Sequence, residues 1–375
     1  MAAFVPTPLP PIDPPLELEG RLAERLRDAE HALARLELAG AMVPDLDWFI
    51  YAFVRKEAVL SSQIEGTQAT LMDLLAFEAL DATEATATAD VEEVCNYLDA
   101  LAFARAELAD PRGVPLSMRL LNEAHRRLLQ GARGHGKLPG EVRRSQNWVG
   151  GTRPGNAVFV PPPPHSLGDL LRSFEAYLHG DDTLPPLARA GLAHVQFETI
   201  HPYLDGNGRI GRLLVTLLLE HWRVLSQPLL YLSLFFKRHR NEYYRRLRAV
   251  RTDGDWEGWL GFFLEGVATI ADEAVLSAQD MFALVSDDRA RVLGHSGASV
   301  SALRLFEALP RHPLVSVSLV MKLTGTSKPT AGRAVESLVE ASVLVETTGK
   351  KRDRSWAYQA YLERLRVGTE LAEGR

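Results

Sequence analysis

Twelve residues, His201 to Arg212, constrain this 375-residue chain more than any other part of it. Their sequence, HPYLDGNGRIGR, combines an imidazole, a carboxylate, an amide, two guanidinium groups and three glycines. Glycines cost backbone entropy on folding and charges are expensive to bury, so an ordinary helix or loop does not favour this mixture. A bound anion would offset both costs. We therefore expect a fold built around an anion-binding turn.

The order of residues predicts how the anion would be held. Gly206 and Gly208 can adopt dihedral angles closed to other residues, so that backbone N–H groups converge at the start of a helix running from Ile210. The positive end of that helix would point at the ligand. Arg209 and Arg212, three residues apart, would share a helix face and grip two phosphoryl groups.

Two further side chains indicate chemistry at this turn. Asp205 can supply an oxygen ligand for Mg2+, which usually arrives with phosphates and keeps several waters. An imidazole with an ordinary pKa of about 6.5 can accept a proton at neutral pH. Pro202 should restrict His201 to extended backbone angles, which would fix where the ring points. We therefore predict a general base beside a phosphate and metal site.

The glycine spacing also matches other motifs. Gly206-x-Gly208-x-x-Gly211 fits the dinucleotide fingerprint, but that fingerprint follows a buried strand, whereas residues 187–200 have the pattern of a helix. A kinase glycine loop has the same spacing, yet its companion motifs do not occur in the sequence. The structural alternative is a glycine-rich turn between two helices with a solvated arginine pair.

The stretch resembles the signature of the Fic family, His-Pro-Phe-x-Asp-Gly-Asn-Gly-Arg-x-x-Arg, with Tyr203 in place of the usual Phe. The resemblance implies transfer of AMP from ATP to a hydroxyl side chain of a target protein. It implies His201 as the base and Asp205 as the Mg2+ ligand. The nucleotide- and phosphate-binding residues that it implies are Gly206, Asn207, Gly208, Arg209, Ile210, Gly211 and Arg212.

A second motif, Ser61-Ser-Gln-Ile-Glu65-Gly66, ends a helix that Asp45 is expected to cap. A solvated Glu65 would be unfavourable there, because the dipole at a helix C-terminus favours cations. The segment, with Ser61, Glu65 and Gly66, resembles the Ser/Thr-x-x-x-Glu-Gly/Asn inhibitory motif of many Fic proteins. That likeness implies that Glu65 pairs with Arg212 and withholds it from the γ-phosphate of ATP.

Helical periodicity dominates the rest of the chain. After a proline-rich arm over residues 2–15, apolar spacing predicts a surface helix from Leu18. A Thr/Ala-rich link, residues 81–90, precedes two core helices expected over 91–108 and 115–129. His194 and Glu198, four residues apart on a later helix, are expected to pair with each other.

Two β-prone runs, 146–149 and 157–160, flank glycines and predict a hairpin. It would either cover the core or, as the family resemblance implies, form a flap that pairs with the target backbone by strand addition. The flap residues would be Val149, Gly150, Gly151, Ala157, Val158 and Phe159. Tyr243 and Tyr244 also have two possible roles, as core aromatics or, as in related proteins, lining the nucleotide pocket.

The last part of the chain differs in charge. Residues 297–375 carry 12 Lys/Arg and 8 Asp/Glu, against a net charge of −6 for the whole chain. Their pattern of three helices and two strands resembles a winged helix-turn-helix. Basic residues would lie on its recognition helix and wing: Lys328, Arg333, Lys350, Lys351, Arg352 and Arg354. DNA binding and protein docking both remain open.

Composition limits the setting. A net charge of −6 argues against a dedicated nucleic-acid protein, and a single cysteine, Cys95, excludes an intramolecular disulfide and fits a reducing compartment. No apolar stretch approaches the ~18 residues of a spanning helix, so we expect a cytoplasmic protein with no membrane partner.

We therefore predict an all-α protein with three parts: an N-terminal helical region with the inhibitory helix (1–90), a Fic catalytic core with a small β-hairpin flap (91–290), and a winged helix-turn-helix (297–375). It would use ATP and Mg2+ to transfer AMP to a Tyr, Thr or Ser hydroxyl, and Glu65 would restrain it. Two alternatives are a hydrolase that removes AMP, with Glu65 orienting a water, and a DNA-binding regulator that senses nucleotide. The target protein, self-modification included, and the choice between monomer and homodimer stay open.

Overall fold

The computed structural model describes residues 3–42, 46–79, 87–131, 135–180, 183–349 and 354–371. Three groups of predicted features lie outside these residues. They are the Asp45 cap, most of the Thr/Ala-rich link (residues 81–86), and the wing residues Lys350, Lys351 and Arg352.

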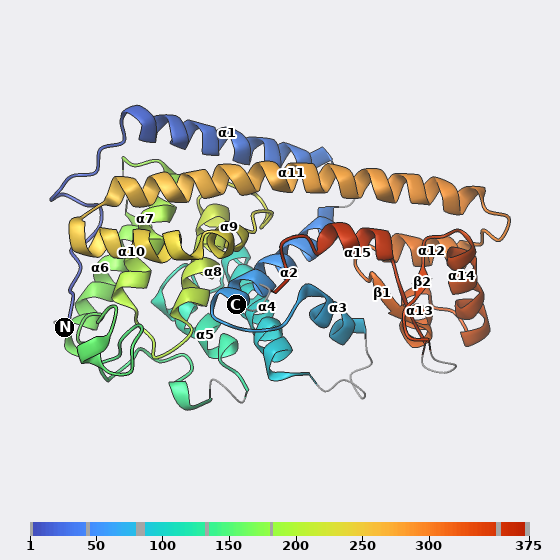
Figure 1. Ribbon diagram of the computed structural model, residues 1–375, viewed down its shortest axis with the longest axis horizontal. Coiled ribbons are helices and arrows are strands. Elements are labelled where there is room, and N and C mark those ends of the chain that lie inside the picture. The colour runs from blue at the N-terminus through green and yellow to red at the C-terminus, as the bar shows by residue number, and fades with distance from the viewer. Residues whose placement is uncertain are drawn as a thin grey trace.

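Helices make up most of the molecule, as the all-α prediction required (Figure 1). The elements up to residue 294 are α1 (Gly20–Met42), α2 (Leu46–Ile64), α3 (Leu71–Ala79), α4 (Ala89–Ala109), α5 (Met118–Leu128), η1 (His135–Lys137), η2 (Pro154–Asn156), η3 (Pro164–Ser166), α6 (Leu167–His179), α7 (Pro186–Ile200), α8 (Asn207–His221), α9 (Ser233–Arg238), α10 (Arg240–Asp253) and α11 (Trp256–Gly294). Those after it are α12 (Val300–Ala308), β1 (Leu314–Ser316), α13 (Val317–Thr324), α14 (Lys328–Glu340), β2 (Val345–Glu346), β3 (Ser355–Ala357) and α15 (Gln359–Leu365).

A long parallel pair, α1 and α11, runs along one side of the molecule (Figure 1). The apolar positions of α1 that the sequence placed at helical spacing, Leu22, Leu26, Ala29, Leu33 and Leu36, are all buried. Helix α11 has 39 residues, so it is about 60 Å long. It runs from the end of the molecule where α10 lies to the C-terminal elements (Figure 1), and buried residues from both regions belong to one hydrophobic core.

Helices α7 and α8 pack against each other in the left half of Figure 1, and α7 also contacts α11. Every residue of α7 from Leu187 to Ile200 is buried, and most of α8 is buried too. Polar side chains on such helices must be paired or serve a ligand, because burial removes their water. The short loop between α7 and α8, residues 201–206, is thus held between two core elements.

The predicted hairpin forms only in part. Val149 and Phe159 make a single antiparallel bridge, with Val149 N–H donating to the Phe159 carbonyl at 2.8 Å. The described residues around the bridge form the short helix η2 instead of two strands. Four prolines, residues 161–164, lack the N–H donors that would extend the ladder.

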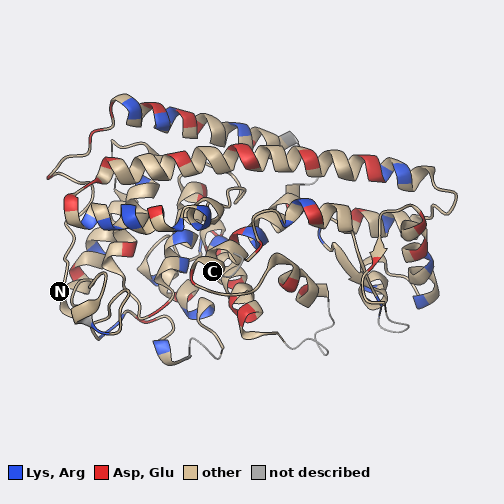
Figure 2. Ribbon diagram, viewed as in Figure 1, with Lys and Arg blue, Asp and Glu red and all other residues tan. Residues whose placement is uncertain are grey.

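The C-terminal elements surround a small antiparallel sheet with the strand order β1-β3-β2. The three expected helices and two expected strands form where the sequence placed them, but strand β1 was missed. It has only three residues, and it exists because Leu314 pairs with Ala357 more than forty positions away. Both charge signs appear on α14 (Figure 2). The winged helix-turn-helix and its binding of DNA stay predictions.

Within the described ranges, no helix combines the length and the apolar character needed to cross a bilayer.

The packing of α1 on α11 makes a first prediction. Leu36→Ala should lower the free energy of unfolding by about 2–5 kcal/mol, because it leaves a cavity at a side chain that is 1% exposed. Leu38→Ala is the matched control on the same helix; its side chain is 61% exposed, so the change should stay within about 0.5 kcal/mol. Urea unfolding followed by circular dichroism measures both, and equal effects would contradict the packing described here.

Candidate active site

The loop between α7 and α8 begins at His201, which closes α7 in a left-handed conformation with φ 51° and ψ 60°. The extended backbone expected before Pro202 is therefore wrong. Two hydrogen bonds hold the unusual angles: His201 N–H donates to the Phe197 carbonyl, and Arg143 Nε donates to the His201 carbonyl, both at 2.9 Å. A left-handed histidine is costly, and such outliers persist where the surroundings over-determine them.

Arg143 is a supporting residue that sequence reasoning missed. Its side chain is buried, and its Nη2 donates to the Pro162 carbonyl at 2.5 Å. Its backbone N–H donates to the Pro202 carbonyl at 2.9 Å. Burial lowers the pKa of Arg143 to about 10, so the group still carries its charge at neutral pH. Arg143 thus joins the loop to the end of the flap segment.

Asn207 shapes the loop with its side chain. Its Oδ1 accepts from Tyr203 N–H at 2.8 Å, and its Nδ2 donates to the Tyr203 carbonyl at 2.9 Å. Gly206 stands before α8 with φ 75°, as its predicted role in the turn requires. Across the described residues no side chain caps α8, so its first N–H groups are left for a ligand.

Tyr203, which replaces the usual phenylalanine of the signature, stacks on His125 with the ring centroids 3.8 Å apart. Its hydroxyl donates to Asn122 Oδ1 at 2.8 Å. Gly140 N–H donates to His125 Nδ1, so Nε2 carries the proton and donates to the Asp205 carbonyl at 3.0 Å. Asn122 and His125 of α5 thus support the loop. The sequence contained one sign of this role, which is that the two residues are three positions apart and so share a helix face.

Gly208 is needed for a different reason than predicted. It lies inside α8 and not in a glycine-only conformation. A Cβ atom there would overlap Glu65 Oε1 and lie 3.0 Å from Arg212 Nη1. The missing side chain therefore makes room for a negatively charged group beside the first turn of α8.

Ile210 and Gly211, predicted to bind the nucleotide, face the interior instead. Ile210 is fully buried in the hydrophobic core. Gly211 packs against α7, where an added Cβ would lie 2.5 Å from Glu198 Oε1. Both are therefore packing residues, Ile210 in the core and Gly211 against α7.

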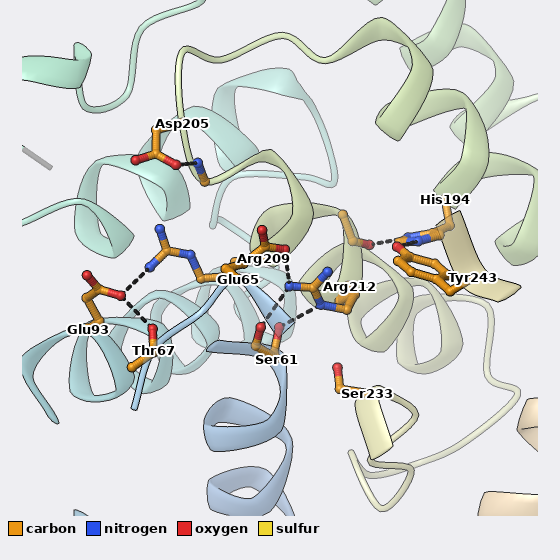
Figure 3. Close-up of polar contacts among 12 residues, drawn as sticks. Ser61, Glu65, Thr67, Glu93, His194, Asp205, Arg209, Arg212, Ser233 and Tyr243 are labelled. Carbon is orange, nitrogen blue, oxygen red and sulfur yellow. Dashed lines mark hydrogen bonds and ion pairs between the residues drawn. The ribbon is translucent and has the colours of Figure 1, made fainter. Parts of the chain in front are cut away.

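Arg212 makes the predicted ion pair with the end of α2 (Figure 3). Its Nη2 donates to Glu65 Oε1 at 2.7 Å and to the Ser61 carbonyl at 2.8 Å, and its Nε donates to Ser61 Oγ at 2.9 Å. Gly66 follows with φ 103° and turns the chain away from α2. Burial alone would raise the pKa of Glu65, but the charge and hydrogen bond of Arg212 outweigh it and lower that pKa. Both partners are therefore charged at neutral pH.

Arg209 points away from Arg212 toward α4 (Figure 3). Its Nη1 lies 3.5 Å from Glu93 Oε2, an oxygen that also accepts from Thr67 Oγ1 at 2.8 Å. The two arginines are thus each held by a separate carboxylate, and their joint binding of one ligand stays a prediction. Within the described structure, Arg209 Nε is buried without a hydrogen-bond partner. A buried donor of this kind is costly unless a ligand satisfies it.

A cavity of about 640 Å3 opens beside this ion pair. His201, Glu65, Gly208, Arg212, Tyr243 and Tyr244 line it, together with the flap residues Val149, Gly150, Val158 and Phe159. Its size suits a nucleotide-sized ligand. Of the predicted flap residues, Gly151 and Ala157 do not line it; Ala157 is buried and Gly151 packs against Asn156.

His201 is neutral in this setting. Burial and, to a lesser extent, the nearby Arg251 guanidinium lower its pKa to about 4. The ring is therefore unprotonated at neutral pH and can accept a proton from a group in the cavity.

Tyr243 combines both of its expected roles. It is 1% exposed and its hydroxyl donates to His194 Nε2 at 2.8 Å, yet its ring reaches the cavity. Tyr244 lines the cavity as well and is 40% exposed.

The expected pairing of His194 with Glu198 is wrong. His194 Nδ1 donates to the Gly211 carbonyl of α8 at 3.0 Å, and the imidazole therefore does not pair with Glu198. Glu198 Oε1 has no hydrogen-bond partner among the described residues, and burial raises the Glu198 pKa to about 7.

Comparison with known proteins supports the geometry. Residues 23–106 match the N-terminal domain of the Fic/DOC family, and residues 115–219 match the Fic/DOC family domain, which together span half of the chain. The second match includes the whole loop from His201 to Arg212.

The chain belongs to the Fic family.

Two relatives carry the name Protein adenylyltransferase Fic. That of Drosophila yakuba is 30% identical over 223 residues, which are 58% of this chain and 41% of the relative. That of Culex quinquefasciatus is 31% identical over 199 residues, which are 49% of this chain and 36% of the relative. This chain thus matches about two fifths of the length of these Fic proteins.

Solved Fic structures share the fold. A Fic family protein from Desulfovibrio desulfuricans G20 superposes with a TM-score of 0.58 at 21% identity, covering 92% of this chain and 97% of that one. A Fic domain containing signaling protein from Bacteroides thetaiotaomicron gives 0.54 at 20% identity, covering 67% of this chain and 95% of that one.

Asp205 is the predicted Mg2+ ligand, and its surroundings show whether it could bind that ion. Its side chain is exposed beside the start of α8, and Oδ1 accepts from Gly206 N–H at 2.6 Å. In the described part of the chain no three His, Cys, Asp or Glu side chains cluster as a metal site. A single carboxylate fits Mg2+ that arrives with phosphates, because that ion keeps most of its waters and needs few protein ligands.

The close approach at Gly208 makes a second prediction. Glycine to alanine inside a helix usually stabilises a protein by up to about 1 kcal/mol. Gly208→Ala should instead lower the midpoint of thermal unfolding, because the new methyl group displaces Glu65 from Arg212. Gly332→Ala on α14, where the added Cβ has open space around it, is the matched control and should raise the midpoint. A similar rise for both variants would show that Glu65 does not occupy this position.

Proposed function

We propose that the protein is an adenylyltransferase that transfers AMP from ATP to a Tyr, Thr or Ser hydroxyl of a target protein. One observation carries the proposal: a neutral imidazole, the uncapped start of α8 and a buried arginine open on the same cavity. These are a base, an anion site and a phosphate ligand. The names of the Drosophila and Culex relatives support the same activity.

In the proposed reaction the target hydroxyl oxygen attacks the α-phosphorus of ATP. The bond from that phosphorus to the bridging oxygen of the β-phosphate breaks, and pyrophosphate leaves. The hydroxyl proton passes to His201. The N–H groups at the start of α8 and the guanidinium groups of Arg209 and Arg212 stabilise the charge that develops on the phosphoryl groups. Asp205 would hold Mg2+, which supplies further neutralisation of the phosphates.

In the conformation with Arg212 bound to Ser61 and Glu65, AMP transfer would be inhibited. Arg212 is committed to Ser61 and Glu65, and the Glu65 carboxylate lies at Gly208, where the first turn of α8 would receive a phosphate. Two anions cannot share that position without strong repulsion. We infer that ATP binds productively only after Glu65 withdraws.

Removal of AMP is a second candidate, favoured by one observation. The Glu65 side chain is 34% exposed and lines the same cavity as His201, so it could orient a water toward a bound adenylyl group. ATP labelled at the α-phosphate distinguishes the activities. Label on protein supports transfer; loss of label from pre-modified protein supports removal; binding without either supports a nucleotide sensor.

Glu65→Gly should raise AMP transfer by about 10²-fold, because it frees Arg212 for the phosphates, and a preorganised donor of this kind is worth about 10²–10³ in rate. Incorporation of label into the protein itself and into a lysate measures the effect. Gln68→Gly is the control, an exposed residue three positions further that should change nothing. Equal rates for Glu65→Gly and the unaltered chain would refute the inhibitory role.

His201→Ala, made in the Glu65→Gly background, should reduce transfer by about 10²–10⁴-fold, which is the usual contribution of a general base. Binding of ATP and Mg2+, measured by calorimetry, should be largely retained, since the phosphate contacts lie on α8. Strong labelling by the double variant would remove His201 from the role of base.

A further inference from the structure

The C-terminal tail, defined as residues 366–371, turns back from α15 and lies against the end of α2. In Figure 1 the chain beyond α15 runs toward α2 and away from α14. Lys237 Nζ on α9 donates to the Gly368 carbonyl at 3.2 Å and to the Glu370 carbonyl at 2.6 Å. The same Nζ donates to Gln63 Oε1 at 2.7 Å.

Gln63 completes this contact from α2. Its Nε2 donates to the Thr369 carbonyl at 2.9 Å and to the Ala69 carbonyl at 2.9 Å. Gln63 lies on the last turn of α2, between Ser61 and Glu65, the two residues that hold Arg212. One turn of helix therefore binds the active-site arginine and, through a different side chain, the tail.

The tail fits its place closely. Thr369 is only 2% exposed. Gly368 has φ 85°, and a Cβ atom there would lie 2.7 Å from Leu234 Cδ1 on α9. The positive φ and the close approach of Leu234 both select glycine at position 368, which indicates a specific contact between the tail and α9.

The other end of α2 also touches the C-terminal elements. Arg311 pairs with Asp47 at 2.9 Å. The rings of Trp48 and Tyr361 have centroids 6.1 Å apart. Tyr51 and His312 are similarly placed at 6.3 Å. Residues 311–371 thus hold α2 at its first turns and at its last turn.

We propose that the C-terminal tail is a docking segment that holds α2 in the position where Glu65 engages Arg212. This proposal rests on the proposed function and names the regulator of the same site. Release of the tail would loosen the last turn of α2 and free Arg212 for the phosphates. A ligand that bound residues 297–371 only with the tail released would raise the activity, because it would favour the released state over the docked one.

Two variants test the docking without touching the nucleotide site. Gly368→Val forces the tail away from Leu234, and Lys237→Met removes the ammonium group that binds it. Each should raise AMP transfer at least about fivefold when Glu65 is present, the lower end of typical coupling between sites. Neither should change transfer in the Glu65→Gly background, where no restraint is left to release. Gly20→Val, a glycine with φ 52° in open space at the start of α1, is the control for backbone strain.

The outcomes separate the two proposals. If Glu65→Gly is active but the tail variants transfer no faster than the unaltered chain, the docking proposal is overturned. Lower activity in both backgrounds would also overturn it, since that result indicates general destabilisation. If Glu65→Gly is itself inactive, the proposed function fails, and hydrogen exchange decides the docking separately. Faster exchange of residues 58–66 in Gly368→Val, and not in Gly20→Val, would support it; unchanged exchange would reject it.

Discussion

The buried guanidinium group of Arg212 is the charge that the surrounding structure has to accommodate. Its side chain is 2% exposed, and a cation so placed is tolerable only with an anion and several acceptors around it. Here α2 supplies both, through the Ser61 oxygens and the Glu65 carboxylate. When a nucleotide binds, its phosphates could take over the same role. Under the proposed inhibition, the site would hold either an internal anion or an external one, and the position of α2 would decide which of them is present.

The loop between α7 and α8 is held by hydrogen bonds of its own. His201 and Gly206 both have positive φ, and the strain at His201 is held by Arg143 on one side and by the end of α7 on the other. Asn207 closes the loop from within through its two bonds to Tyr203. These contacts do not involve α2. The base and the start of α8 can therefore keep their geometry whether or not Glu65 is in place.

The sequence correctly predicted the structural features that depend on residues close together along the chain. The buried face of α1 and the presence of α2, α7 and α8 follow from helical periodicity, and the resemblance of two short motifs to those of Fic proteins predicted the pairing of Glu65 with Arg212. Prediction from the sequence failed for features that depend on a residue far away along the chain. The backbone of His201 depends on Arg143, strand β1 depends on Ala357, and the need for glycine at position 208 depends on Glu65. His194 was given the wrong partner for the same reason, since its acceptor lies on another helix.

The uninterrupted course of α11 has a mechanical consequence. A single helix from Trp256 to Gly294 carries the chain from the catalytic region to the C-terminal elements, so no flexible tether separates the two. A helix of this length bends only gently without a proline or a bulge, and its sequence contains no proline. Large swings of the C-terminal elements are therefore disfavoured. The catalytic region and the C-terminal elements are therefore joined by a stiff helix and not by a flexible linker.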